Sequence, residues 1–247
     1  FFVKVNNFLD KPKYFLLKNK KMYLWHQYYN YMFSLSEENY LKSIYHLEAI
    51  HGKGISTNSI AKKLETKASS VTDMIKKLAE KEVLVYKKYQ GVSLTTLGRK
   101  EATTIVRKHR LWEVFLVDKL NFSWDEVHDV AEQLEHIKSP KLIDELDVFL
   151  GFPKMDPHGD PIPDKEGNFQ KIEKRLLSTL EEHKTGICVG VNDSSSDFLK
   201  YLDKNNISLG QKIKVLSKES FDGSLTILIH SKEITISKKI SNNIYIQ

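Results

Sequence analysis

The sequence predicts an α+β protein with an N-terminal winged helix-turn-helix, a central all-α domain and a small C-terminal β-barrel-like domain. Three observations predict this architecture. Helical periodicity dominates residues 36–150 apart from one strand pair, a segment rich in Pro and Gly follows, and short strand-like runs prevail from residue 187 onward. A chain of 247 residues can form one large domain or two to three small ones.

Charge is distributed unevenly along the chain, whose net charge is +6. Residues 52–100 hold eleven basic and four acidic side chains, whereas residues 101–170 hold eight basic and fifteen acidic ones. A basic segment followed by an acidic one indicates an anion-binding module attached to a cation-binding module.

Cysteine usage and hydropathy bear on the compartment. Cys188 is the single cysteine, which excludes an internal disulfide and a zinc site made of several thiolates. No apolar run has the length of a membrane span, and no signal peptide is recognisable. These features predict a cytoplasmic protein that does not act at a membrane.

Residues 1–31 are rich in aromatic residues and lysine but lack helical periodicity. One interpretation is a basic arm that contacts DNA phosphate or a membrane. The favoured alternative is an extension that takes no part in the fold, because nothing downstream requires this stretch.

A helix-turn-helix is predicted in the basic segment. The first helix starts at Ser36, with Glu37 and Glu38 in its first turn, and ends at Gly52 or Gly54. Two further helices are predicted, 56–64 with Ser56 or Thr57 as its cap and 68–81 with Ser69 as its cap. The short turn between them is typical of a helix-turn-helix.

A basic hairpin completes a winged helix over residues 32–100. Strands are predicted at 83–85 and 92–94, around the turn Tyr89–Gln90–Gly91. Winged helices also serve as protein–protein modules, but the basic charge and the hydroxyl-rich third helix favour DNA. The candidate DNA-binding residues are Lys67, Ser69, Ser70, Thr72, Asp73, Lys76, Lys77, Lys87 and Lys88.

Three helices are predicted in the acidic segment, at 95–120, at 127–136 with Ser123 as its cap, and from Pro140 to Gly151. They contain more Trp, Phe and Leu than a small winged helix needs for its core. This excess predicts a homodimer interface in a domain spanning 101–152, because palindromic operators require a two-fold protein.

The helix at 127–136 also groups possible metal ligands. His128, Glu132, Glu135 and His136 fall at i, i+4, i+7 and i+8 beside an apolar stripe, and imidazole and carboxylate groups suit a divalent metal. A second i, i+4 pair, His109 and Glu113, lies in the preceding helix. The alternative is a solvated acidic helix face.

Residues 151–170 contain four of the six prolines and mark a domain boundary. A linker and connecting helix are expected over 153–184, with the helical stretch at 171–183. A third domain, 185–247, follows, with strands at 187–191, 212–216, 225–230 and 233–237 and one helix at 195–203.

Residues 33–247 resemble the diphtheria-toxin-repressor and manganese-transport-regulator family of metal-dependent transcriptional repressors. The matching stretches are NYLKSIYHLE, SSVTDMIKKL, LTTLGRK, RKHRLWEVFL, VHDVAEQLEH and MDPHGDPIP. The tail resembles the C-terminal domain of the longer members, which implies an SH3-like β-barrel.

The resemblance implies a primary metal site that consists of Asn39, His109, Glu132, Glu135 and His136. A carboxylate at the position of Glu132 is typical of manganese-sensing members, and hard oxygen ligands suit Mn²⁺ or Fe²⁺. Two residues depart from the family pattern. Asn39 stands where Asp or Met is usual, and Lys42 replaces a Glu of binuclear members, which argues against a binuclear centre.

An ancillary site is also implied, made of Glu113, His128, Asp156, His158 and Asp197. Asp156 could instead only form a turn before Pro157, and His128 could be an ordinary surface histidine.

The resulting hypothesis is a regulator, and not an enzyme, that binds Mn²⁺ or Fe²⁺ as co-repressor. It would then bind a palindromic double-stranded operator as a homodimer and control metal-uptake genes, with no small-molecule substrate. A metal-independent winged-helix regulator is the alternative. A metalloenzyme is a remote one, because no HExxH motif is present.

Overall fold

The computed structural model describes residues 33–170, 173–193 and 195–247. The extension predicted at residues 1–31 therefore lies outside the described residues. The chain divides into two compact units, with the division after Arg99. Among the described residues, no helix is long and apolar enough to cross a membrane.

The first unit is a winged helix-turn-helix. Its elements are α2 (Leu35–His51), α3 (Thr57–Lys63), α4 (Ala68–Glu80), β1 (Leu84–Lys87) and β2 (Gly91–Leu94). Apolar side chains of all three helices and of the hairpin are buried in its core, as helical and strand periodicity predict: Leu41, Ile44, Ile60, Val71, Ile75, Leu78, Leu84 and Val92.

Two of the cap residues predicted for the helices of this unit are wrong. α2 is capped by Ser34, not Ser36, because Ser34 and Glu37 form a reciprocal capping box. Ser34 N–H donates to Glu37 Oε2 at 2.7 Å, and Glu37 N–H donates to Ser34 Oγ at 3.3 Å. Ser69 does not cap α4, which starts after Lys67 without a side-chain cap, whereas Ser56 caps α3 as predicted.

The wing is joined to the α2–α3 connection. β1 and β2 pair antiparallel, and Ile55 forms an isolated bridge with Val92 through two 2.8 Å backbone hydrogen bonds. Gly54 and Gly91 have positive φ, and a Cβ on Gly91 would lie 2.6 Å from the Gly54 carbonyl oxygen. Glycine is therefore required where the wing meets this connection.

Three helices open the second unit. α5 (Thr96–Leu120) begins just before the division, and α6 (Val127–Leu134) and α7 (Pro140–Phe149) follow it. A shared apolar core includes Leu111, Leu116, Val127, Ala131, Ile143 and Leu146.

The end of α6 sets the positions of two candidate ligands. Glu126, not Ser123, is the N-cap residue, and Ser123 instead bonds the Glu126 carboxylate through its hydroxyl at 2.7 Å. The helix ends at Leu134 rather than at His136, so Glu135 and His136 lie in the turn that follows.

Residues 151–170 form an ordered irregular segment along α5. Met155 and Pro161 form an isolated bridge. Arg107 and Arg110 of α5 donate hydrogen bonds to the carbonyl oxygens of Pro163 and Pro161, respectively. Proline provides no N–H for a regular ladder, so these arginines bind the segment through its carbonyls.

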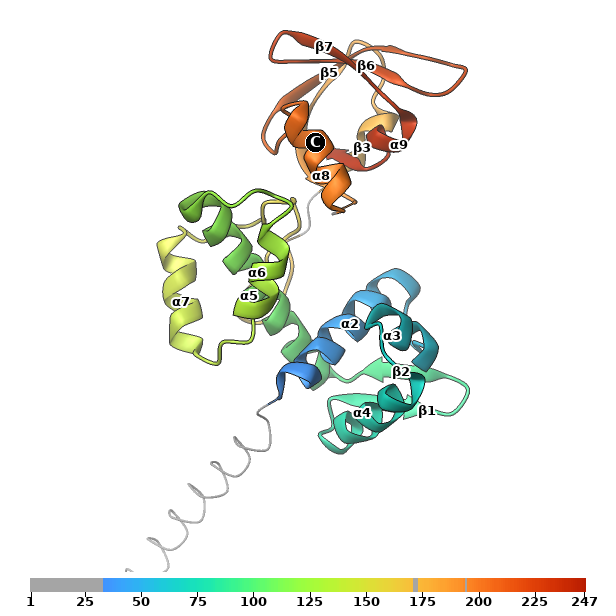
Figure 1. Ribbon diagram of the computed structural model, residues 1–247, viewed down its shortest axis with the longest axis vertical. Coiled ribbons are helices and arrows are strands. Elements are labelled where there is room, and N and C mark those ends of the chain that lie inside the picture. Colours follow the sequence, from blue (N-terminus) through green and yellow to red (C-terminus); the bar gives the residue numbers. More distant parts are fainter. Residues whose placement is uncertain (1–32, 171–172, 194) are drawn as a thin grey trace, which may run out of the picture. The chain divides into compact units, whose positions relative to one another are not determined.

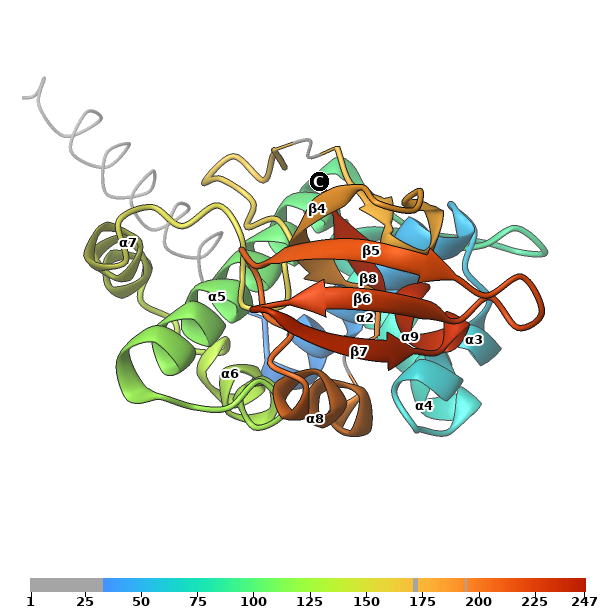
Figure 2. The same cartoon turned by 90° about the horizontal axis from the view of Figure 1, so that it is seen from above.

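The remainder is a six-stranded antiparallel sheet in the order β3-β8-β4-β5-β6-β7. Its strands are β3 (Arg175–Leu176), β4 (Thr185–Val191), β5 (Lys212–Lys218), β6 (Leu225–Ile229), β7 (Lys232–Ile236) and β8 (Ile244–Ile246). The segment also contains η1 (Leu177–Thr179), α8 (Ser196–Lys204) and α9 (Lys238–Ser241). Figure 2 looks onto β5, β6 and β7.

The helix predicted at 171–183 is wrong in the part that the structure describes. Arg175 and Leu176 pair with β8, and Leu177 and Leu180 enter the core of the sheet. The helix-like spacing of Leu177 and Leu180 therefore reflects one 3₁₀ turn that follows a short strand. β8 was not predicted, because three residues at the chain end carry too little alternation to recognise.

Candidate metal centre

Two helices and the segment after α7 supply the candidate ligands of the second unit. α5 carries His109 and Glu113, and α6 carries His128 and Glu132. Residues at i and i+4 face the same side of a helix, so each helix presents an imidazole beside a carboxylate.

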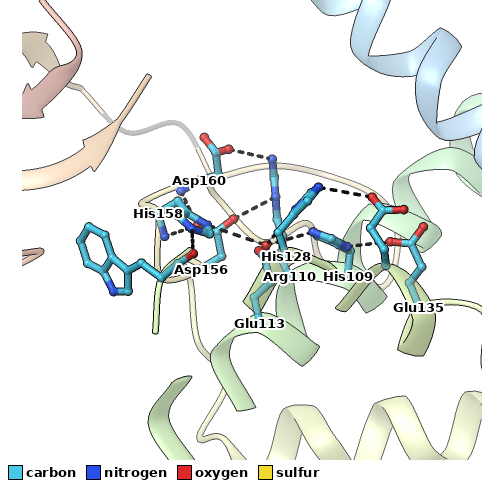
Figure 3. A network of polar contacts seen from close by, with 10 residues as sticks. His109, Arg110, Glu113, His128, Glu135, Asp156, His158 and Asp160 are labelled. Atoms are coloured by element: carbon cyan, nitrogen blue, oxygen red, sulfur yellow. Dashed lines mark hydrogen bonds and ion pairs between the residues drawn. The ribbon is translucent and has the colours of Figure 1, made fainter. Parts of the chain in front are cut away.

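Four side chains form a continuous buried chain of polar contacts (Figure 3). Glu135 Oε2 lies 2.7 Å from His109 Nδ1, and His109 Nε2 lies 3.0 Å from Glu113 Oε1. Glu113 Oε1 in turn lies 3.7 Å from Nδ1 of His158. All four residues are buried. Burial of so many ionisable groups requires mutual compensation, which the alternation of carboxylate and imidazole provides.

His128 lies at the solvent-exposed side of this chain. Its Nδ1 is 3.5 Å from Glu113 Oε1, its Nε2 is 3.7 Å from Glu132 Oε1, and its ring contacts that of His109 edge to face. The His128 side chain is 57 % exposed. It is thus a surface histidine, as the alternative interpretation held, yet its ring nitrogens face the carboxylates of both helices.

Asp156 both forms a turn and reaches the cluster. Its Oδ1 accepts the backbone N–H groups of His158 and Asp160, each at 2.9 Å. Its Oδ2 lies 3.3 Å from Arg110 Nε. The turn predicted as the alternative to ligation is present, and Asp156 nevertheless groups with Glu113 and His158.

Arg110 and Asp160 are site residues that the sequence analysis missed. Arg110 Nη2 lies 3.3 Å from Asp160 Oδ2, so one guanidinium contacts two carboxylates of the segment. The available signal was positional: Arg110 directly follows His109, and Asp160 lies four residues after Asp156.

Burial and close charges shift the pKa values of the cluster. Burial alone would raise the pKa of Glu113, but the adjacent imidazoles of His109, His128 and His158 outweigh it and hold that pKa well below its usual range. Burial, followed by the nearby Glu113 charge, raises the pKa of Asp156 to about 7. Burial opposes charging of His158, yet its contact with the Glu113 carboxylate raises the His158 pKa.

Among the described residues, three groups of side chains could each hold a metal ion. Within each group, the possible ligand atoms lie within 4.8 Å of one another. The groups are His109–Glu113–His128, His109–Glu132–Glu135 and Glu113–Asp156–His158. Their nitrogen and oxygen atoms fit a divalent Mn²⁺ or Fe²⁺ ion. The only cysteine is buried in the sheet core, where burial raises its pKa to about 11, and thiolate ligation is excluded.

The remaining predicted ligands differ in position. Asn39 lies on α2 in the first unit, and its Oδ1 is buried without a hydrogen-bond partner among the described residues. His136 is half-buried, with Nε2 3.8 Å from Glu135 Oε1. Asp197 is exposed on α8 and belongs to none of the three groups. His109, predicted for the primary site, contacts ligands of both sites.

All nine candidate DNA-binding residues are exposed on α4, its N-cap and the wing, namely Lys67, Ser69, Ser70, Thr72, Asp73, Lys76, Lys77, Lys87 and Lys88. Two of the lysines have acidic neighbours. Lys76 Nζ lies 3.5 Å from Asp73, and Lys77 Nζ lies 3.3 Å from Glu37.

Three protein families match successive segments of the chain. Residues 32–92 match the iron dependent repressor N-terminal DNA binding domain, and residues 95–164 match the iron dependent repressor metal binding and dimerisation domain. Residues 175–247 match the FeoA domain.

Individual relatives agree with these matches. The chain is 36 % identical over 117 residues to an HTH-type transcriptional regulator of Methanocaldococcus jannaschii, covering 47 % of this chain and 94 % of the relative. It is 27 % identical to the diphtheria toxin repressor of Corynebacterium diphtheriae, covering 85 % and 96 %. With an iron-dependent repressor of Mycobacterium leprae it shares 36 % identity, covering 51 % of this chain and 54 % of the relative.

Solved structures extend the similarity to the fold. A manganese-dependent transcriptional repressor in complex with manganese superposes with a TM-score of 0.72 at 35 % identity, covering 85 % of this chain and 98 % of that chain. A manganese-activated repressor in its apo form gives 0.65 at 35 % identity, covering 85 % and 99 %. The chain belongs to the diphtheria-toxin-repressor and manganese-transport-regulator family of metal-dependent transcriptional repressors.

Proposed function

We propose that this chain is a transcriptional repressor that uses Mn²⁺ or Fe²⁺ as co-repressor, binds a palindromic operator as a homodimer and controls metal-uptake genes. The observation that carries this proposal is the buried chain from Glu135 through His109 and Glu113 to His158. It joins two helices and the segment after α7 in a protein that also has an exposed helix-turn-helix.

The proposal assigns two metal sites that meet at His109. The primary site consists of Asn39, Glu132, Glu135 and His136, and the ancillary site of Glu113, His128, Asp156 and His158. A ligating histidine uses one ring nitrogen and orients itself through the other. His109 can thus bind an ion beside Glu113 while its other nitrogen holds Glu135, or the reverse. Asp197 is left out, since it is exposed and apart from the groups.

Repulsion between carboxylates is the reason why metal binding can change the structure. Residues 101–170 carry fifteen acidic and eight basic side chains, and several of the carboxylates are buried close together. When bound, a divalent ion supplies the positive charge that compensates them. Glu132, Glu135 and His136 would then be held in one geometry, which favours the state that binds DNA.

Dimerisation is assigned to the three-helix domain. Large apolar side chains are exposed at the end of α5, along α7 and just after α7: Leu120, Leu142, Val148, Phe149 and Phe152. Exposed large apolar side chains on one domain are typical of a subunit interface. A two-fold pair would place two copies of α4 on successive half-sites.

Two finer points of architecture belong to the same proposal. We infer that the six-stranded sheet closes into an SH3-like barrel. This inference is supported by its strands, which pair in the order β3-β8-β4-β5-β6-β7 and share one apolar core. The domain limits are 32–100, 101–152 and 185–247, with 153–184 as linker. We also propose that the chain is a regulator and not an enzyme, because its relatives are transcriptional regulators.

The decisive experiment is operator binding as a function of metal. An operator is selected from a random double-stranded library, and its affinity is measured with Mn²⁺, Fe²⁺ and Zn²⁺ at matched free concentrations. Glu132→Ala and His136→Ala should each abolish the metal-dependent gain. Asp129→Ala, which removes an exposed carboxylate of α6, is the matched control and should bind as the parent does.

Each alternative predicts a different result. A metal-independent regulator would bind the operator equally in every condition and variant. A metalloenzyme would turn over a substrate only with metal and would lose that activity in Glu132→Ala. Either result would contradict the proposed function.

A further inference from the structure

Glu37 is a buried carboxylate that the metal sites do not use. It occupies the third position of α2 and is only 1 % exposed. Its Oε2 accepts the Ser34 N–H at 2.7 Å, so the capping box fixes its direction. Its Oε1 faces the end of α4. This helix, labelled together with α2 in Figure 1, is the one that the proposed function assigns to DNA recognition.

Two lysines one turn apart converge on that oxygen. Lys81 Nζ lies 2.8 Å from Glu37 Oε1, and Lys77 Nζ lies 3.3 Å from it. Lys81 also lies over the Phe33 ring, with Nζ 5.0 Å from the centroid, and its side chain is 22 % exposed. The Lys77 side chain is 55 % exposed and remains open to solvent on its other side.

The ion pairs between Glu37 and the two lysines restrict the position of α4 more narrowly than its apolar contacts do. Burial of Val71, Ile75 and Leu78 holds α4 in the module, but hydrophobic contact is non-directional and tolerates small sliding or rotation. The two ion pairs converge on one buried oxygen whose direction the capping box fixes, so they favour one position of the two lysine ammonium groups. They fix the register of the end of α4 against the first turn of α2.

We propose that Glu37 is a positioning residue of the DNA reader, which holds Lys77 and Lys81 and thereby sets the recognition helix against the helix that carries Asn39. The proposal rests on the proposed function only for the identity of the ligand, DNA.

The test compares Glu37→Gln and Lys81→Ala with Glu80→Gln, which removes an exposed carboxylate from α4 itself. Full-length protein is saturated with Mn²⁺, and affinity is measured for the selected operator and for non-specific DNA. Glu37→Gln and Lys81→Ala should each weaken operator binding by about tenfold and leave non-specific binding within about twofold, because α4 is misaligned while its phosphate contacts persist. Glu80→Gln should change neither.

Two further measurements separate positioning from folding and from phosphate contact. The double variant Glu37→Gln/Lys81→Ala should lose no more than either single variant, since both act through one contact. Lys77→Ala should also reduce the salt dependence by about one phosphate contact, whereas Lys81→Ala should not. The Mn²⁺ concentration that half-fills the sites without DNA should stay the same in Glu37→Gln.

The outcomes distinguish this inference from the proposed function. Operator binding by folded Glu37→Gln within twofold of the parent, or an equal loss on non-specific DNA, would overturn the inference. If the parent binds the operator regardless of metal, the metal sensor fails, and the same comparison still decides the role of Glu37. If the parent binds no DNA, both are overturned.

Discussion

The two candidate metal sites differ in how much of each lies within one unit of the fold. The ancillary group is formed by α5, α6 and the segment after α7, all in the second unit, and Arg110 and backbone N–H groups already hold Asp156. Of the residues proposed for the primary site, Asn39 belongs to the first unit, whereas the others belong to the second. The residues of the ancillary group are therefore preorganised within one unit, whereas the proposed primary set includes one residue of the other unit.

Arg110→Ala gives the largest expected effect, because it removes preorganisation from the ancillary group. Asp156 would lose its guanidinium partner while remaining buried, and breaking a buried ion pair typically costs about 3 kcal/mol or more. Urea unfolding of the metal-free protein measures this loss. Mn²⁺ should restore part of it by compensating the same carboxylate.

Asp160→Asn is the matched control, since the Asp160 side chain is 47 % exposed and its ion pair with Arg110 is worth little. If the two variants unfold at the same urea concentration, Arg110 does not preorganise the site.

Glu113→Gln tests whether the two sites are separable. Glu113 lies beside His109, His128 and His158, and a neutral amide there should weaken ancillary Mn²⁺ binding by roughly 100-fold, or about 2.7 kcal/mol. Primary binding should change far less, because Glu132, Glu135 and His136 are untouched. Calorimetric titration resolves the two steps, and loss of both steps together would show one centre in place of two.

Protons should compete with metal at the ancillary site. Asp156 must ionise to ligate, and its pKa is raised to about 7, so Mn²⁺ affinity there should fall by about tenfold per pH unit below 7. In the metal-free protein, the stability of the fold depends on pH in the opposite direction and is greater at low pH. A raised folded-state pKa contributes stability at low pH that is lost between the ordinary value of 3.8 and about 7.

Thermal unfolding at pH 6 and pH 8 checks both signs. The rise in melting temperature on adding Mn²⁺ should be larger at pH 8, and Asp156→Asn should remove much of that pH dependence. A metal-induced rise that is the same at both pH values would contradict the assignment of Asp156.

The sequence predicted the helices that carry ligands better than the contacts between the ligands. Periodicity was sufficient for α5 and for the winged helix, because long amphipathic helices are defined by local pattern. The position of His109 between both sites was not predictable, since it depends on α6 packing against α5. Arg110 was missed for the same reason: its partners lie about fifty residues away, and spacing along the chain does not reveal them.

Ser34→Ala is the smallest effect and bears on the primary site alone. Losing the Ser34 hydroxyl removes one half of the capping box and should destabilise the first turn of α2 by about 1 kcal/mol. Asn39 lies just after that turn, so part of the metal-binding energy must reorder the start of α2, and primary Mn²⁺ affinity should fall by about fivefold at most. Ancillary affinity should remain unchanged, because every residue proposed for that site lies in the other unit. Ser59→Ala, near the start of α3 in the same module, controls for a general loss of order. A fall in ancillary affinity in Ser34→Ala would mean that the two sites do not differ in their dependence on α2.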